Sequence, residues 1–293
     1  MGTETLPYGT DSSLQTVTVT TFAQPSNTGY WLVLIHGGAW RDPTQTSTNY
    51  LAPISNLLSP KIRNNTAPLP IAGIASISYR LSEHPDHPQD PKSTLIHDLR
   101  TAKHPDHIKD VQAALAFLQA RYGFGDRYVL VGHSCGAILA FQSVMGRFRS
   151  ANDVSVPRAI LGMAGIYNIR LIRDMHPGVA AYQEIIEGAF GADENGWDAA
   201  SPAVVDGEEG VEGGWGVSGR LAVLAHSSED GLVDLEQRDA MRTALRRWEA
   251  VSPGRAVELL DLTGQHDEAW EKGDELARGI IFVLEKLRVM ESA

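Results

Sequence analysis

The sequence has little cysteine and no long apolar run. Cys135 is the only cysteine among 293 residues, which excludes an internal disulfide and is compatible with a reducing compartment. No apolar run approaches the ~18 residues that a membrane-spanning helix needs. The stretch from Met1 to Gln15 lacks a basic region followed by an apolar one, so no secretory signal is expected. These absences predict a cytoplasmic protein without a membrane partner.

An excess of positive charge is also missing. Acidic residues number 36 against 25 basic ones, which gives a formal net charge of −11. Like-charge repulsion then disfavours nucleic acid and anionic membrane surfaces as partners. The charge suits a small neutral, zwitterionic or cationic substrate. It leaves the oligomeric state open, with a homodimer as one candidate.

Short apolar runs alternate along the chain with longer helical patterns. The runs expected as strands are Thr16–Phe22, Trp31–Ile35, Ile71–Tyr79, Tyr128–Val131, Ala159–Met163, Leu221–Ala225 and Val257–Leu262. The main helical windows are Lys109–Tyr122, Ala137–Phe148, Leu235–Ala250 and Glu275–Val289. This alternation predicts an α/β fold with a mostly parallel central sheet covered by helices on both faces. Polar and apolar residues alternate in the first run, as in an antiparallel edge strand.

One long irregular segment interrupts the alternation, at about residues 168–219. It contains a helical piece around Ala180–Ala189 and becomes rich in Gly and Glu from Gly207 to Gly219. Connections of this length are usually lids, binding loops or disordered segments. We expect a single domain over residues 1–293, a small cap over the site in the first half of the segment, and a mobile surface loop in its second half. Decoration without function is the alternative.

The most informative motif is Gly132-His133-Ser134-Cys135-Gly136. It lies between an apolar strand and a helix of small residues, the context of the nucleophile elbow G-x-S-x-G. A serine hydroxyl is a poor nucleophile at neutral pH and must be held where a base can reach it. Glycines on both sides of so sharp a turn avoid collisions of Cβ atoms with backbone. The motif predicts Ser134 as a nucleophile.

A serine nucleophile needs a base, and the base needs an acid to fix its tautomer. Asp230 follows the run Leu221–Ala225, and His266 follows the last strand, in Thr263-Gly264-Gln265-His266-Asp267. The order serine, acid, histidine at three strand ends is that of the α/β-hydrolases. Glu229 and Asp234 flank Asp230 and are the alternatives for the acid, and His226 lies close by.

A second motif, His36-Gly37-Gly38-Ala39-Trp40, ends the strand Trp31–Ile35. An H-G-G-x loop at this place supplies oxyanion-hole N–H groups in lipases and esterases. We expect the donors among Gly37, Gly38, Ala39 and Cys135. The Cys135 side chain itself is expected to act as a small structural hydrophobe. His133, inside the elbow, is not expected to reach its neighbour's hydroxyl.

His-Pro-Asp-His occurs twice, at residues 84–87 and 104–107. A metal site is the alternative interpretation, but the pairs lack a nearby thiolate and proline breaks helical presentation of both rings. The second copy is typical of a helix start, with proline early and an acidic residue favourable to the helix dipole. We expect no metal and no organic cofactor.

Several segments together resemble the fungal type of kynurenine formamidase (arylformamidase), a member of the α/β-hydrolase superfamily. They are HGGAW at 36–40, ISYRLS at 77–82, HPDHIKDV at 104–111, GHSCGA at 132–137, GIYNI at 165–169, AFG at 189–191 and SP at 201–202. The resemblance runs from about Tyr30 to the C-terminus, and the 207–219 stretch fits it less well. By motif position it implies Ser134 as nucleophile, Asp230 as acid and His266 as base.

The resemblance implies hydrolysis of N-formyl-L-kynurenine, a small-molecule substrate, to L-kynurenine and formate in tryptophan catabolism. A formyl group offers almost nothing to recognise, so specificity must come from the leaving-group side. Trp40, Tyr167 and Trp270 are candidates for contact with the substrate ring, and each could equally be a packing aromatic. The groups that hold the amino-acid end of the substrate are not visible in the sequence.

Two other functions compete with this one. A carboxylesterase of the hormone-sensitive-lipase type shares the triad and the oxyanion loop but acts on short acyl esters. A hydrolase fold that only binds a ligand is disfavoured, because such relatives typically lose the nucleophile or the base.

Overall fold

The computed structural model describes residues 2–22, 29–50, 70–149 and 154–292. The strands are β1 Gly2–Pro7, β2 Thr16–Thr21, β3 Tyr30–Ile35, β4 Ile71–Ile77, β5 Tyr128–His133, β6 Ala159–Met163, β7 Leu221–Ser227 and β8 Ala256–Leu262. The α-helices are α3 Asp106–Tyr122, α4 Cys135–Gln142, α5 Ile169–Asp174, α6 Ala180–Phe190, α7 Glu194–Ala200, α8 Val211–Gly214, α9 Leu235–Ala250, α10 Glu268–Glu271 and α11 Asp274–Ser292. Short 3₁₀ turns are η1 Ile96–Asp98, η2 Gly146–Phe148 and η3 Gly207–Glu209.

The strands form one eight-stranded sheet in the order β1-β2-β4-β3-β5-β6-β7-β8. The pairs from β4 through β8 are parallel, while β2 runs antiparallel to both β1 and β4. The predicted mostly parallel sheet is therefore confirmed. The expectation that residues 16–22 form the edge is wrong, because β1 covers that side. All residues of β1 but one are exposed, so the sequence has no apolar pattern that predicts this strand.

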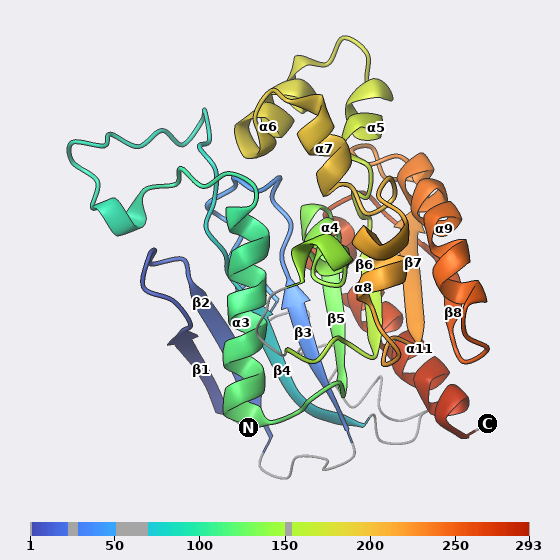
Figure 1. Cartoon of the computed structure of the whole chain (residues 1–293). Helices are drawn as coiled ribbons and strands as arrows, with labels where there is room; N and C mark the ends of the chain where they lie inside the picture. Colours follow the sequence, from blue (N-terminus) through green and yellow to red (C-terminus); the bar gives the residue numbers. More distant parts are fainter. Residues whose placement is uncertain (1, 23–28, 51–69, 150–153, 293) are drawn as a thin grey trace.

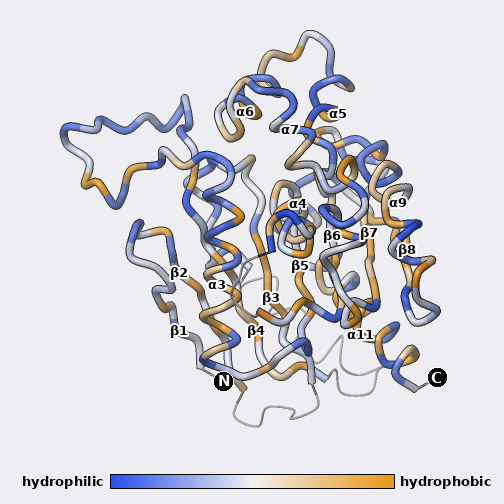
Figure 2. Tube along the Cα trace, viewed as in Figure 1, coloured by the Kyte–Doolittle hydropathy of each residue, from blue (hydrophilic) through white to orange (hydrophobic). Residues whose placement is uncertain are grey.

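Helices cover both faces of the sheet, and alternate residues of each strand point to opposite faces. On β3, Val33 and Ile35 belong to one core with α3, α4 and α9, while Leu32 and Leu34 belong to a second core with α11. Figure 1 shows α3, α4 and α9 on the near face and α11 behind the sheet. Figure 2 shows hydrophobic residues concentrated along the strands between these layers. Among the described helices, none combines the length and apolar character needed to cross a bilayer.

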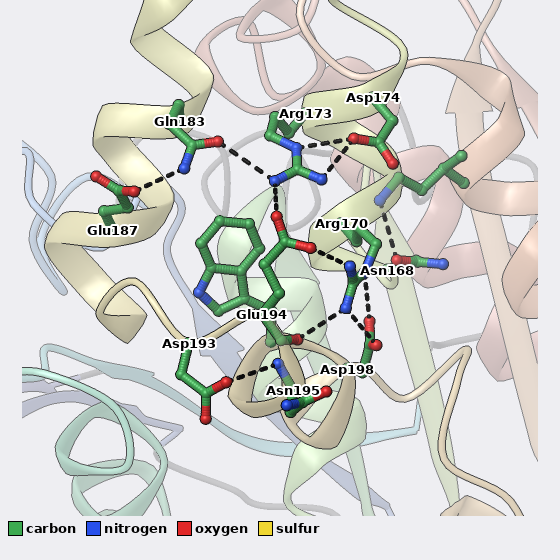
Figure 3. A network of polar contacts seen from close by, with 12 residues as sticks. Asn168, Arg170, Arg173, Asp174, Gln183, Glu187, Asp193, Glu194, Asn195 and Asp198 are labelled. Carbon is green, nitrogen blue, oxygen red and sulfur yellow. Dashed lines mark hydrogen bonds and ion pairs between the residues drawn. The ribbon is translucent and has the colours of Figure 1, made fainter.

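The first half of the 168–219 segment, for which a cap is predicted, contains α5, α6 and α7, which lie together at one end of the sheet (Figure 1). A charged network joins them, as Figure 3 shows. Arg170 on α5 binds Asp198 at 2.6 Å and also Glu194, both on α7, and Arg173 binds the same Glu194. The Arg173 guanidinium also lies 5.1 Å from the ring centre of Trp197. These contacts fix α5 against α7.

The second half of the segment differs from the expected mobile surface loop. Residues 207–214 form η3 and α8, and Trp215 is fully buried, stacked on Trp248 of α9 at 4.4 Å between ring centres. The Trp215 indole N–H donates to the Pro157 carbonyl at 2.8 Å. A Cβ on Gly214 would lie 2.2 Å from the Val144 carbonyl oxygen. Glycine at this position therefore permits close backbone packing.

Two further differences concern helix bounds and the histidine repeats. Helix α4 ends at Gln142 instead of Phe148. The N–H groups of Val144 and Met145 donate to carbonyls three residues back, and the Gly146 N–H donates to the Gly210 carbonyl. The second His-Pro-Asp-His copy does begin α3, as predicted. The first copy lies in the segment between β4 and α3, which extends away from the sheet (teal in Figure 1).

Replacing Trp215 by alanine tests whether the glycine-rich segment belongs to the core. We expect Trp215→Ala to lower the free energy of unfolding by about 3–5 kcal/mol, because a fully buried indole and its hydrogen bond are lost. Urea unfolding followed by circular dichroism measures the change. Val217→Ala is the matched control, because that side chain is 89% exposed. Equal effects of the two substitutions would show that the segment does not stabilise the fold.

Candidate active site

The elbow at residues 132–136 has the strained backbone that its sequence predicts. Ser134 adopts φ 53° and ψ −122° between β5 and α4. A Cβ on Gly132 would lie 2.3 Å from the Gly136 carbonyl oxygen, and a Cβ on Gly136 would lie 2.3 Å from the carbonyl oxygen of Ile35. Only glycine tolerates either contact, so both positions are needed to hold Ser134 at this angle.

The Ser134 side chain faces a cavity of about 580 Å³ whose wall also includes His266. Among the described residues, nothing forms a hydrogen bond with the Ser134 hydroxyl, and its oxygen is not one of the fully buried unpaired atoms. The hydroxyl is therefore accessible from the cavity. Both residues are only 7% exposed, so their chemistry takes place largely out of water.

Asp230 and His266 form a close pair. The His266 Nδ1–H donates to Asp230 Oδ2 at 2.7 Å, which leaves Nε2 as the nitrogen free for the cavity. Asp230 Oδ1 accepts hydrogen bonds from the backbone N–H groups of Leu232 and Val233, both at 2.9 Å. Burial alone would raise the pKa of Asp230, but hydrogen bonds from His226, His266 and the Val233 N–H hold it well below its usual range. The carboxylate is thus ionised and fixed.

The competitors of Asp230 are placed elsewhere. Glu229 is exposed, and Asp234 faces His176 at 2.8 Å. His226 has a role that the sequence did not suggest. It is fully buried, its Nε2–H donates to the Val233 carbonyl at 2.8 Å, and it lies 3.3 Å from Asp230 Oδ2. His226 therefore holds the acid loop closed around the carboxylate.

His133 links the elbow to the histidine loop. Its Nε2–H donates to the backbone carbonyl of His266 at 3.0 Å, and the two rings lie 4.8 Å apart. Burial lowers the pKa of His133 to about 3, so the ring is neutral. As expected, His133 is not the hydrogen-bond partner of Ser134. Its observed role is to position the loop of His266.

The His-Gly-Gly loop lies against the elbow in an unusual backbone conformation. Gly38, Ala39 and Trp40 have successive positive φ values of 90°, 50° and 59°. A Cβ on Gly37 would lie 3.1 Å from Ser134 Cβ, so this glycine allows the loop to approach the serine. The carbonyls of His36 and Gly37 accept hydrogen bonds from the Tyr79 hydroxyl, and these contacts fix the loop.

Two side chains of this region contribute through packing. The His36 ring stacks on Tyr79 at 4.4 Å, and burial lowers the pKa of His36 to about 4. The Cys135 sulfur accepts a hydrogen bond from Trp40 N–H at 3.3 Å, and burial raises the pKa of this thiol to about 11. A neutral buried thiol is a weak nucleophile. The sulfur thus anchors the loop, a polar role beyond that of the expected small hydrophobe.

The three aromatic residues considered for substrate contact differ in whether they line the cavity. Trp40 and Trp270 line the cavity with Ser134 and His266. Tyr167 does not line it: its ring packs against Phe141 at 5.6 Å, and its hydroxyl fills the space beside two glycines. Of the two interpretations that the sequence left open for Tyr167, its 1% exposure favours the packing aromatic.

One group of side chains in the described part of the chain could share a metal ion, namely His133, His266 and Asp267, whose ligand atoms lie within 4.8 Å of one another. It coincides with the site described above. Neither His-Pro-Asp-His copy forms such a group among the described residues.

Comparisons with known proteins identify the family of the chain. Residues 32–284 match the model of the alpha/beta hydrolase family. A kynurenine formamidase-like hydrolase of Fusarium equiseti is 38% identical over 91% of this chain and 88% of its own length. A kynurenine formamidase of Aspergillus versicolor is 35% identical over 92% of this chain and 96% of its own length.

Solved structures share the fold at low identity. Esterase B from Lactobacillus rhamnosis superposes with a TM-score of 0.65 at 15% identity, over 99% of this chain and 88% of the esterase. A hyperthermophilic esterase from Pyrobaculum calidifontis gives 0.62 at 16% identity, over 95% and 82%. The chain therefore belongs to the α/β-hydrolase superfamily and, within it, to the kynurenine formamidase family.

Proposed function

We propose that this enzyme hydrolyses the formamide of N-formyl-L-kynurenine to L-kynurenine and formate, with Ser134 as nucleophile, His266 as base and Asp230 as acid. The observation that carries the proposal is the 2.7 Å contact between His266 Nδ1 and Asp230, at the wall of a cavity that also reaches Ser134. The relatives named kynurenine formamidase support the substrate class.

In the first half of the reaction, His266 Nε2 takes the proton of the Ser134 hydroxyl as Oγ attacks the formyl carbon. The ionised Asp230 stabilises the imidazolium that forms. The carbon–nitrogen bond then breaks, and His266 gives its proton to the departing aryl amine. In the second half, His266 takes a proton from water as it attacks the formyl ester of Ser134. The bond from the formyl carbon to Ser134 Oγ then breaks, His266 returns the proton to Oγ, and formate leaves.

Charge on the carbonyl oxygen needs N–H donors that are aimed before the reaction. The backbone amides of Gly38, Ala39 and Cys135 are the candidates. The two loop residues line the cavity, and Cys135 directly follows the nucleophile. The Tyr79 hydroxyl and the Cys135 sulfur hold the loop in place, so the donors need no reorganisation during catalysis.

The rest of the cavity suits an aromatic leaving group. Its wall combines Trp40 and Trp270 with isoleucines from the cap helices α5 and α6, namely Ile172, Ile185 and Ile186. Such a wall buries an aryl ring while leaving little specific contact for the formyl hydrogen.

The substrate preference separates this function from that of a short-chain carboxylesterase, and two of the proteins with a similar fold are esterases. We expect purified protein to hydrolyse N-formylkynurenine with a kcat/KM at least tenfold above that for nitrophenyl acetate and butyrate, because the cavity provides a site for an aryl leaving group. Ultraviolet absorbance follows both reactions. Turnover of the esters with none of the formamide would assign the esterase function instead.

Removal of the nucleophile tests the mechanism. We expect Ser134→Ala to lower kcat by roughly 10⁴- to 10⁶-fold, because the residual rate comes only from binding and the oxyanion donors. The matched control is Ser228→Ala, an exposed serine of the acid loop, which should keep its activity. Circular dichroism checks that both variants fold. A Ser134→Ala enzyme that retained a tenth of the activity would exclude this serine as nucleophile.

The ionised state of Asp230 predicts a pH-dependent contribution to stability. A folded-state pKa held below the usual 3.8 stabilises the protein above that pH, and this stabilisation is lost as the pH falls towards the folded-state pKa. We therefore expect the wild type to be more stable than Asp230→Asn at about pH 6, with the difference shrinking below about pH 4. Urea unfolding across this range measures it, with the exposed Asp239→Asn as control. A difference that does not depend on pH would contradict the assignment.

A further inference from the structure

We propose that Arg41 binds the carboxylate at the amino-acid end of the substrate and thereby selects formamides that carry a free amino-acid group. This inference rests on the proposed function, because the carboxylate in question belongs to the zwitterionic substrate named there. It supplies the contact that the sequence left unassigned.

The first observation is the charge of the cavity wall. Within residues 2–22, 29–50, 70–149 and 154–292, Arg41 is the one arginine or lysine that lines it. Asp42 and Asp267 are the acidic members of the wall, and the whole chain carries a net charge of −11. For an anionic group that enters this cavity, Arg41 is therefore the permanent cation that the described part of the wall provides.

The histidines of the wall do not replace Arg41. His176 lies 2.8 Å from Asp234 and stacks on Tyr182, so it is already engaged. Partial burial and the neighbouring Arg41 charge lower the pKa of His84, which favours its neutral form. Arg41 keeps its charge at every relevant pH.

The second observation is the geometry of the guanidinium. The side chain is only 13% exposed, and its Nη1 donates to Glu184 Oε1 of α6 at 2.8 Å. Among the described residues, this is the only hydrogen bond that Arg41 makes through its side chain, and neither Nε nor Nη2 is a fully buried unpaired atom. A guanidinium has donors to spare for a second carboxylate, which it binds through two parallel hydrogen bonds.

The third observation is the position of Arg41 in the chain. It directly follows the 36–40 loop, so the segment proposed to hold the oxyanion also carries the cation. Ala39 and Arg41 are two residues apart, which limits their Cα separation to about 7 Å. Arg41 and His84 also line an adjoining cavity of about 390 Å³, which gives the amino-acid end room beyond the aryl ring. The wall of that second cavity includes Arg100, whose Nη2 donates to the His87 carbonyl, so Arg41 is the cation that the two cavities share.

A structural role is the competing explanation: the Arg41–Glu184 pair could merely fasten α6 to the loop. The two explanations differ for Glu184, whose side chain is 58% exposed. If the pair only fastens the cap, loss of either partner has the same effect. If Arg41 binds substrate, loss of Glu184 removes a competing carboxylate and does not weaken binding.

The test compares two formamides with the wild type, Arg41→Gln, Arg41→Lys and Glu184→Gln. One is N-formyl-L-kynurenine, and the other is 2-formamidoacetophenone, which has the same aryl formamide and ketone without the amino-acid end. We expect Arg41→Gln to lower kcat/KM for N-formylkynurenine about 10- to 100-fold, mainly through KM, as fits the loss of hydrogen bonds between charged groups. Its loss on the acetophenone should be at least tenfold smaller, Arg41→Lys should fall between, and Glu184→Gln should not raise KM.

Equal losses on the two formamides, or a Glu184→Gln enzyme that behaves like Arg41→Gln, would overturn the inference in favour of a fastening role. A wild-type enzyme that does not hydrolyse N-formylkynurenine would overturn the proposed function itself. The assay of the wild type alone gives this result, so it is distinguished from a failure of the inference about Arg41. Product inhibition provides a measurement that does not depend on a variant folding. L-kynurenine should inhibit the wild type at least tenfold more strongly than 2-aminoacetophenone, and equal inhibition would contradict carboxylate binding at this site.

Discussion

The site depends on the close approach of the backbone of α4 to the end of β3. A Cβ on Gly136 would lie 2.3 Å from the Ile35 carbonyl oxygen, so this approach is available only to glycine. It brings the residue after the nucleophile beside the 36–40 loop, and the Cys135 sulfur then accepts the Trp40 N–H. The positive φ of Ser134 and those of the loop residues are local strain that this packing maintains. Nucleophile and candidate oxyanion donors are therefore set by one contact between distant segments.

Much of this arrangement could be predicted from the sequence, because its causes are local. A strand followed by G-x-S-x-G leaves few conformations for Ser134, and apolar runs of five to seven residues are typical of buried parallel strands. The sequence favoured Asp230 over Glu229 and Asp234 by motif position, and the structure shows the contacts that distinguish them. Three acidic residues in one loop have similar sequence signals, and they are separated only by which one receives the backbone N–H groups and the His266 ring.

The predictions that failed concern contacts between segments far apart in the chain. Trp215 packs on Trp248, and Gly214 packs on the backbone at Val144, so a glycine-rich segment that resembled a mobile loop is part of the core. Glycine has the same sequence signal whether it provides flexibility or close approach. Tyr167 illustrates the same limit, because an aromatic residue after a strand end can face the cavity or the core. The sequence gives His226 only as a neighbour of the acid position, whereas its contacts stabilise the Asp230 carboxylate.

The cavity divides recognition unevenly between its two ends. A formyl group presents only hydrogen on its acyl side, so contacts with that side contribute little binding energy. The enzyme must therefore bind the leaving group instead. In our proposal, the aryl ring lies among the tryptophans and the cap isoleucines, and the charged end reaches Arg41. Because Arg41 is adjacent to the 36–40 loop, a substrate bound there positions its carbonyl against donors of the same segment. Binding energy from the remote carboxylate can then reduce the entropy cost of orienting the formamide, which connects substrate selection with the rate of the chemical step.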